Sequence, residues 1–203
     1  MQSLGLGNAY LFKVEQSDSG GLRGIRLTVS NQEQNPPHRR WVDLRKLISE
    51  ASLSSSLKAN VLNVFCTLAE AEATVHGCSP DQVHFHEIGA IDSLVDVIGV
   101  CAAVESLSPG KIYCNAPAVG HGLVKTAHGV LPVPVPAVLE LAKRHQVPIR
   151  TGEDLPAVEL TTPTGIALMA VLANQFHRPS TMEVEGIGVG LGHRLLDRPN
   201  LLR

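Results

Sequence analysis

The fold is decided by residues 84–107, which read HFHEIGAIDSLVDVIGVCAAVESL. The second part, 94–107, is apolar on nearly every side, which predicts a helix buried inside the protein. Asp92 or Ser93 would cap this helix, because a short side chain with an oxygen satisfies its first amides. The first part would be a strand, with His84 on one face and Phe85 pointing into a core. A strand followed by a buried helix predicts an α/β fold.

Strand-like and helix-like segments alternate on both sides of this stretch. Residues 9–15 and 22–29 read as a hairpin of two strands, and residues 57–75 as a helix with one apolar stripe, begun near Ser54 and closed by Gly77. Further elements are expected as strands over 111–119 and 186–192 and as helices over 43–51, 137–144 and 166–174.

The predicted fold class is therefore α/β, with a mixed α+β arrangement left open. We expect a mixed sheet covered by the 57–75 and 94–107 helices, in a single compact domain with an amino-terminal hairpin extension. In this division, residues 1–40 form the hairpin and its loop, and residues 41–203 form the main domain that carries a cluster of His and Asp side chains.

Composition narrows the class of protein. The chain has 203 residues, of which 44% are hydrophobic and 18% are charged, as in globular proteins. A net charge of -2 and the lack of a basic stripe give no reason to expect nucleic acid as a partner. No apolar run approaches the roughly 20 residues that span a bilayer, so we expect no membrane partner. The four cysteines form no Cys-x-x-Cys pair, which favours a cytoplasmic protein.

Two imidazoles and two carboxylates stand close together in the sequence, within residues 84–92. Clustered His and carboxylate side chains in a loop are typical of metal or ligand sites. Asp96, one turn after Asp92, would be costly near a buried helix unless something pairs with it. The ordinary alternative is a set of polar side chains at the end of a strand. Our hypothesis is one cleft whose metal ligands are His84, His86, Glu87 and Asp92, with His128 as a fifth member.

Two further segments are candidates for binding a substrate. Gly120 and Gly122 would allow the backbone to approach a ligand closely, although tight turns are the commoner reason for such glycines. Thr162, followed by a proline, would cap the 166–174 helix, and its start, with Thr164 and Gly165, could hold an anion on free amides and hydroxyls. An ordinary helix cap is the commoner explanation of that pattern.

The sequence resembles the pyridinium-3,5-bisthiocarboxylic acid mononucleotide nickel chelatase family, the nickel-insertion proteins of nickel-pincer cofactor assembly. The similar segments are residues 84–93, 126–134, 160–165 and 197–200. The resemblance implies insertion of nickel, as substrate metal, into a dithiocarboxylated pyridinium mononucleotide, with one nickel–carbon and two nickel–sulfur bonds formed. It also implies a lyase that hydrolyses CTP with manganese or magnesium, and a product that serves lactate racemase.

The sequence departs from the family pattern in three places. Family members open with an acidic, glycine-rich strand and loop that this chain lacks, and many carry a histidine-rich run where this chain has residues 35–40, NPPHRR. The family also continues into a carboxy-terminal domain, where the nucleotide triphosphate site is expected. We therefore expect a fragment that is inactive alone, with a carboxy-terminal chain of the same protein and the apo lactate racemase as partners. The oligomeric state is open, with a homo-oligomer among the alternatives.

Two other function classes remain. In the first, the chain is a non-catalytic structural or assembly module, in which His84, His86 and Asp92 join a helix to a sheet. In the second it is a metal-dependent hydrolase, because a His-x-His strand also begins such sites. The second class is the weaker, since 203 residues fall short of the roughly 250 that the usual eight-stranded barrel requires.

Overall fold

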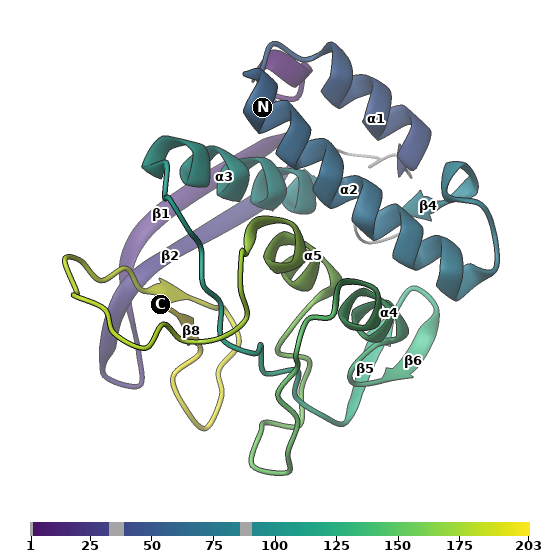
Figure 1. The fold of residues 1–203 in the computed structure, drawn as a ribbon. Coiled ribbons are helices and arrows are strands. Elements are labelled where there is room, and N and C mark those ends of the chain that lie inside the picture. Colours follow the sequence, from purple (N-terminus) through teal and green to yellow (C-terminus); the bar gives the residue numbers. More distant parts are fainter. Residues whose placement is uncertain (1, 33–38, 86–90) are drawn as a thin grey trace.

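The computed structural model describes residues 2–32, 39–85 and 91–203. The α/β class is confirmed, with helices on one side of the molecule and a long β-hairpin on the other (Figure 1). The α-helices of the described residues are α1 (Trp41–Glu50), α2 (Ser55–His76), α3 (Ile91–Leu107), α4 (Pro136–His145) and α5 (Pro163–Leu172). The 3-10 helices are η1 (Gln2–Leu4) and η2 (Pro80–Gln82).

Helix α2 is the centre of the core, because it contacts α1, α3, α4 and α5. Its apolar stripe includes Val61, Phe65 and Leu68, which have no exposed surface. The side chain of Ser54 accepts a hydrogen bond from the Leu57 amide at 3.1 Å, and Gly77 ends the helix with a left-handed φ of 66°. The predicted helix and both of its ends are confirmed, since the cap and the glycine act locally.

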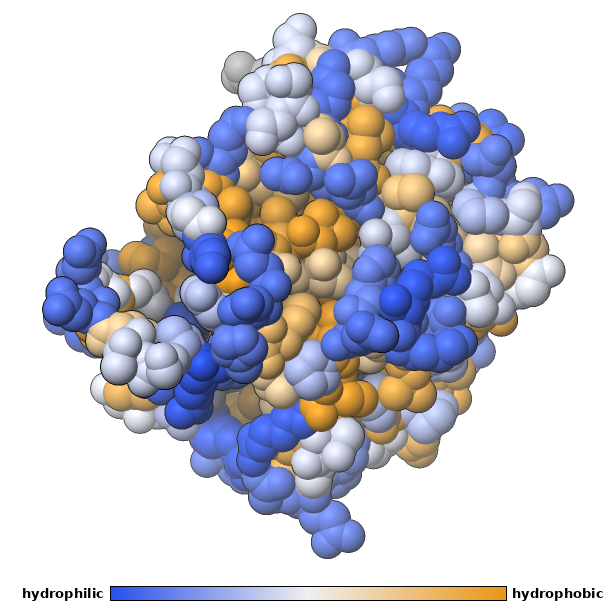
Figure 2. All heavy atoms as spheres, in the orientation of Figure 1, coloured by the Kyte–Doolittle hydropathy of each residue, from blue (hydrophilic) through white to orange (hydrophobic). Residues whose placement is uncertain are grey.

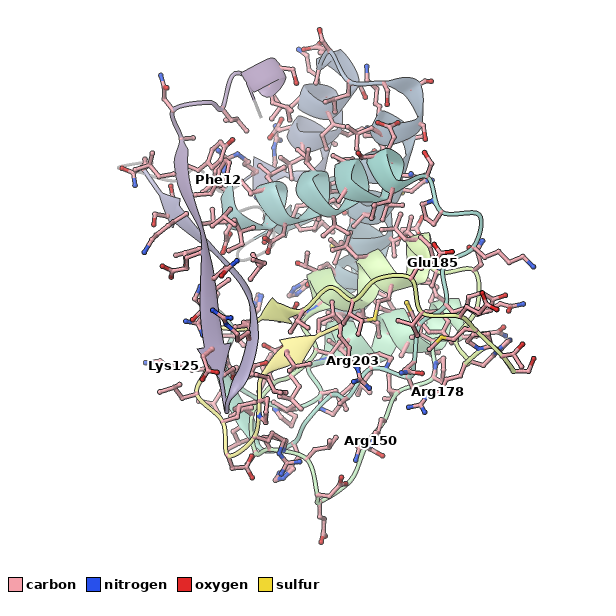
Figure 3. The ribbon with its side chains drawn as sticks, turned by 90° about the vertical axis from the view of Figure 1, so that its left-hand side faces the viewer. Phe12, Lys125, Arg150, Arg178, Glu185 and Arg203 are labelled. Carbon is pink, nitrogen blue, oxygen red and sulfur yellow. The ribbon has the colours of Figure 1, made fainter. Side chains whose placement is uncertain are left out.

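The main sheet grows from the amino-terminal hairpin. Strands β1 (Tyr10–Ser19) and β2 (Leu22–Asn31) pair antiparallel, and the turn between them uses positive φ at Gly20 and Gly21. Strand β7 (Gly190–Leu191) joins β2 in parallel, and β8 (Leu201–Leu202) pairs antiparallel with β7. The predicted hairpin is confirmed, and Figure 3 shows it standing beside the helices, with Phe12 near one end.

Two small antiparallel pairs complete the described strands. Strand β3 (Arg39–Arg40) pairs with β4 (His84–Phe85), and β5 (Leu123–Thr126) pairs with β6 (Gly129–Pro132). Phe85 is 2% exposed and its ring lies 6.3 Å from that of Phe65, whereas His84 is exposed. The predicted alternation of this strand is therefore confirmed at its first two residues.

Four expectations about local structure are wrong. Residues 111–119 form no strand and make only isolated bridges, because their backbone bonds go to loop residues such as Gln175 and Arg150. Within residues 186–192, only Gly190–Leu191 forms a strand. Its pairing with β2 is limited to Gly190 opposite Ile25. Ile91 is already helical, so neither Asp92 nor Ser93 is the cap. Helix α3 is buried on one face only, and Val100 is 40% exposed.

The covering of the sheet also differs from the expectation. Helix α3 lies against β2, but α2 packs on other helices, because its apolar stripe is shared among four of them. The division at residue 40 stays a prediction, although β7, from the proposed second part, extends the sheet of the hairpin. Among the described helices, none combines the length and the apolar character needed to cross a membrane.

Candidate metal and anion site

His84 lies at the exposed edge of the β3–β4 pair, opposite Arg40. Arg40 donates hydrogen bonds to the Asp43 carboxylate, with Nε to Oδ2 at 2.8 Å. These bonds are the main reason that the pKa of Asp43 is lowered, and the nearby His84 adds a smaller lowering. His84 is thus close to a carboxylate that is already ion-paired. The predicted ligands His86 and Glu87 lie outside the described residues.

Asp92 is exposed in the first turn of α3, and its Oδ1 accepts a hydrogen bond from the Ser93 amide at 2.8 Å. Loss of hydration raises the pKa of Asp96, and the Asp92 carboxylate raises it further. His193, from the loop after β7, opposes this shift and lies 3.0 Å from Thr28, Nε2 to Oγ1. The start of α3 therefore lies near two polar side chains, Thr28 of β2 and His193 of the loop after β7.

His128 is in the turn between β5 and β6. Its amide donates to Thr126 Oγ1 at 3.1 Å, and the same hydroxyl donates to the Gly129 carbonyl at 3.0 Å. The imidazole of His128 lies against that of His76, the last residue of α2, with 4.8 Å between ring centroids. Glu72 Oε2 is 3.3 Å from His76 Nε2. Figure 1 shows this end of α2 beside the β5–β6 hairpin.

The three described members of the predicted metal cluster have different neighbours. His84 is near Asp43, Asp92 is near Asp96, and His128 contacts His76. Within residues 2–32, 39–85 and 91–203, no group of three or more His, Cys, Asp or Glu side chains could hold a metal ion. The cluster as a whole stays a prediction, since it depends on His86 and Glu87.

His76 and His193 were missed in the sequence. His76 is followed by a glycine that ends a helix, and that C-cap signal marks only the end of the helix. His193 follows a glycine-rich run in which no periodicity predicts which neighbours a side chain will meet. Contacts between distant segments place His76 against His128 and His193 near Asp96.

The glycines at 120 and 122 let two chain segments meet. A Cβ on Gly120 would lie 1.9 Å from the Val158 carbonyl oxygen, and one on Gly122 would lie 3.3 Å from that of Ala157. Both residues have positive φ, and Gly120 bridges to Glu159. The close approach that they permit is therefore to the 157–159 segment, and their role toward a substrate stays a prediction.

The start of α5 is held by two threonines. Thr161 Oγ1 donates to the Ala118 carbonyl at 2.6 Å, and Thr162 Oγ1 accepts from the Gly165 amide at 3.2 Å. The predicted cap is confirmed. Pro163 has no amide hydrogen, and the Ile166 amide donates to the Thr162 carbonyl. An anion here would therefore meet mainly the Thr164 amide and the two hydroxyls of Thr162 and Thr164.

Residues 197–200, DRPN, lie in the loop between β7 and β8, and their hydrogen bonds connect this loop to other parts of the chain. Arg198 donates to the Asp197 carboxylate at 2.9 Å and to the Asp154 carbonyl at 2.7 Å. The Asn200 amide donates to Ser19 Oγ at 3.2 Å, which ties this loop to the end of β1. These contacts give the motif a structural role in this chain.

Two open cavities lie away from these residues. The larger, of about 340 Å³, lies between the start of α2 and the ends of α3 and α5, and includes Asn60, Glu105 and Leu172. On the face of the molecule shown in Figure 2, apolar side chains gather in the middle, over α5. The smaller, of about 310 Å³, is formed by the hairpin and residues 187–189. Neither cavity is lined by a predicted site residue.

Comparison with protein families gives one match that covers the chain. Residues 1–203 match the family model described as nickel insertion protein. A relative from Clostridium kluyveri, named pyridinium-3,5-bisthiocarboxylic acid mononucleotide nickel insertion protein, is 38% identical over 214 residues. The alignment covers 100% of this chain and 53% of the relative.

A second relative with the same name, from Nocardioides sp., is 45% identical over 192 residues. That alignment covers 94% of this chain and 48% of the relative. The chain thus spans about half the length of the curated relatives that it matches. No solved structure matches the chain.

Proposed function

This chain belongs to the nickel insertion protein family, and we propose that it takes part in inserting nickel into pyridinium-3,5-bisthiocarboxylic acid mononucleotide. The observation that carries the proposal is the family match over residues 1–203, together with two relatives that are named for this substrate. In this proposal nickel is the metal that is handled and transferred, and the activity is that of a chelatase of the lyase class.

The donors of the chain suit temporary binding of nickel. Nickel accepts imidazole nitrogen and carboxylate oxygen, and the chain offers both near β4, at the start of α3 and in the β5–β6 turn. A thiolate cage would hold the metal too firmly for delivery. The described cysteines do not form one, and the thiols of Cys66, Cys101 and Cys114 have a raised pKa because of burial, which disfavours the metal-binding thiolate.

The start of α5 would hold the phosphate of the mononucleotide. Helix starts favour anions because their amides point outward and the helix dipole is positive there. Thr162 and Thr164 add hydroxyls, and the Thr164 amide is the main backbone donor left for a ligand. We expect modest affinity that depends on the Thr164 hydroxyl.

We further propose that the chain supplies the nickel and mononucleotide parts of the reaction, while CTP, with manganese or magnesium, binds in the half of the relatives that this chain does not cover. The chain alone would then bind nickel without completing insertion. The apo lactate racemase would receive the product. This division is supported by the family match and by the chain covering only about half the length of its relatives, while CTP, its metal and the racemase are proposed from the family resemblance.

A reconstitution experiment tests the proposal. The chain is incubated with the nickel-free mononucleotide, Ni²⁺, CTP and Mn²⁺, with and without the uncovered half of the Clostridium kluyveri relative, and the nickel product is detected by mass spectrometry. We expect product only with both parts present. As positive control, the full-length relative forms product. If replacing its covered half with this chain abolishes product while the hybrid protein is folded, the proposal is wrong.

A further inference from the structure

We propose that His76 and His128 bind one nickel ion together and that Glu72 orients His76 for this role. The inference rests on the proposed function, in which nickel is the metal handled. It pairs the predicted ligand His128 with His76 and Glu72, to which no sequence pattern assigned a role. The site joins the last turn of α2 to the turn between β5 and β6, and we call it the His76–His128 pair.

The distance between the two rings fits two ligands of one ion. With metal–nitrogen bonds of about 2.1 Å, two imidazoles bound at adjacent octahedral positions have ring centroids about 4.6 Å apart. In this structure the centroids are 4.8 Å apart and the rings are inclined by 47°. The His76 side chain is 37% exposed and His128 is also exposed, so an ion can reach both from solvent.

Glu72 lies where a carboxylate that supports a metal-binding histidine is expected. Its Oε2 is 3.3 Å from His76 Nε2, one helical turn earlier on α2, and its side chain is only 18% exposed. In metal sites, a carboxylate on one nitrogen of a histidine ring fixes the tautomer and makes the other nitrogen a better ligand. We propose this role for Glu72, which would leave Nδ1 of His76 for the metal.

The backbone also favours a cation here and holds both histidines in place. His76 is the last residue of α2, and the negative end of a helix dipole stabilises positive charge. Gly77 closes the helix at once, and the Thr126 hydroxyl bonds to both the His128 amide and the Gly129 carbonyl. Each imidazole therefore projects from a locally fixed turn.

Two imidazoles are an incomplete ligand set, which suits a site that passes its metal on. Nickel would keep its remaining positions for water or for donors of the incoming mononucleotide.

The test is titration of the purified 203-residue chain with NiCl₂, followed by calorimetry and by NMR of histidine ring protons. Paramagnetic Ni²⁺, added below one equivalent, should broaden the His76 and His128 resonances together. His76→Ala and His128→Ala should each weaken nickel binding by at least the 10–100-fold seen for outer-shell partners, and Glu72→Gln by about tenfold. His177→Ala is the matched control, because His177 is also exposed and in contact with a ring, that of Tyr113.

The outcomes separate this inference from the proposed function. If nickel binds but broadens neither ring, or if His128→Ala weakens binding and His76→Ala does not, the pair is only a ring contact and the inference is wrong, while the function stands. If the chain binds no nickel at all, both are wrong. Thermal unfolding of each variant shows that lost binding does not come from lost folding.

Discussion

The carboxylate of Asp92 lies one helical turn before that of Asp96 on α3, and its charge adds to the loss of hydration that raises the pKa of Asp96. The folded protein therefore binds this proton more tightly than the unfolded chain does. Protonated Asp96 therefore stabilises the folded state at low pH. This stabilisation is lost as the pH rises from the ordinary aspartate pKa of 3.8 through the raised pKa of Asp96 in the folded protein.

Asp96→Asn should therefore stabilise the protein at pH 7, because an amide avoids the cost of the charge. We expect a gain of less than about 1 kcal/mol, since solvent screens a partly exposed group. Urea unfolding at pH 7 and near pH 3 measures the difference, which should vanish at the lower pH. Asp92→Asn should lower the pKa of Asp96 without restoring the ordinary value, because lost hydration is the larger cause.

Gly120→Ala should destabilise the chain more than the same change at Gly129. Both glycines have positive φ, but an added Cβ at Gly120 meets the Val158 carbonyl, whereas nothing lies within 4 Å at Gly129. Strained backbone costs about 1–2 kcal/mol in both variants, and overpacking adds about 1–3 kcal/mol at Gly120 alone. Equal losses of unfolding free energy in the two variants would show that the contact with Val158 is unimportant.

Thr162→Ala should cost stability, while Thr164→Val should not. Thr162 accepts the Gly165 amide as the cap of α5, and removing such a cap costs about 0.5–2 kcal/mol. Thr164 follows Pro163 inside the first turn and should affect only the proposed phosphate contact. Chemical unfolding gives the stabilities, and calorimetry gives the affinity for the mononucleotide. Unchanged affinity in Thr164→Val would remove the basis for an anion site at α5.

Cys101 should resist alkylation in the folded protein. It has no exposed surface, and burial raises the pKa of its thiol to about 11. The reactive species is the thiolate, which is scarce at pH 8 under these conditions. Mass spectrometry after treatment with iodoacetamide should find Cys101 unmodified in native protein and modified in urea. Rapid labelling of the native protein would mean that α3 opens readily.

Local signals in the sequence predicted much of the helical part of the fold. The Ser54 cap, the apolar stripe of α2 and the closing Gly77 each act within a few residues, so their pattern is sufficient. The same holds for Thr162 and α5. Strand prediction failed at 111–119 and mostly at 186–192, because a strand needs a partner and distant segments decide which partner is present.

The candidate site divides in the same way. The sequence by itself indicated the family, and it offered histidines, acidic residues and threonines as candidate ligands for nickel and phosphate. Only the tertiary structure shows that His76 lies against His128 and that His193 lies beside Thr28. It also shows that Gly120 allows close contact with the Val158 carbonyl. Residue type and local spacing are written in the chain, whereas contacts between distant residues arise only when packing of α2, α3 and the hairpins fixes their relative positions.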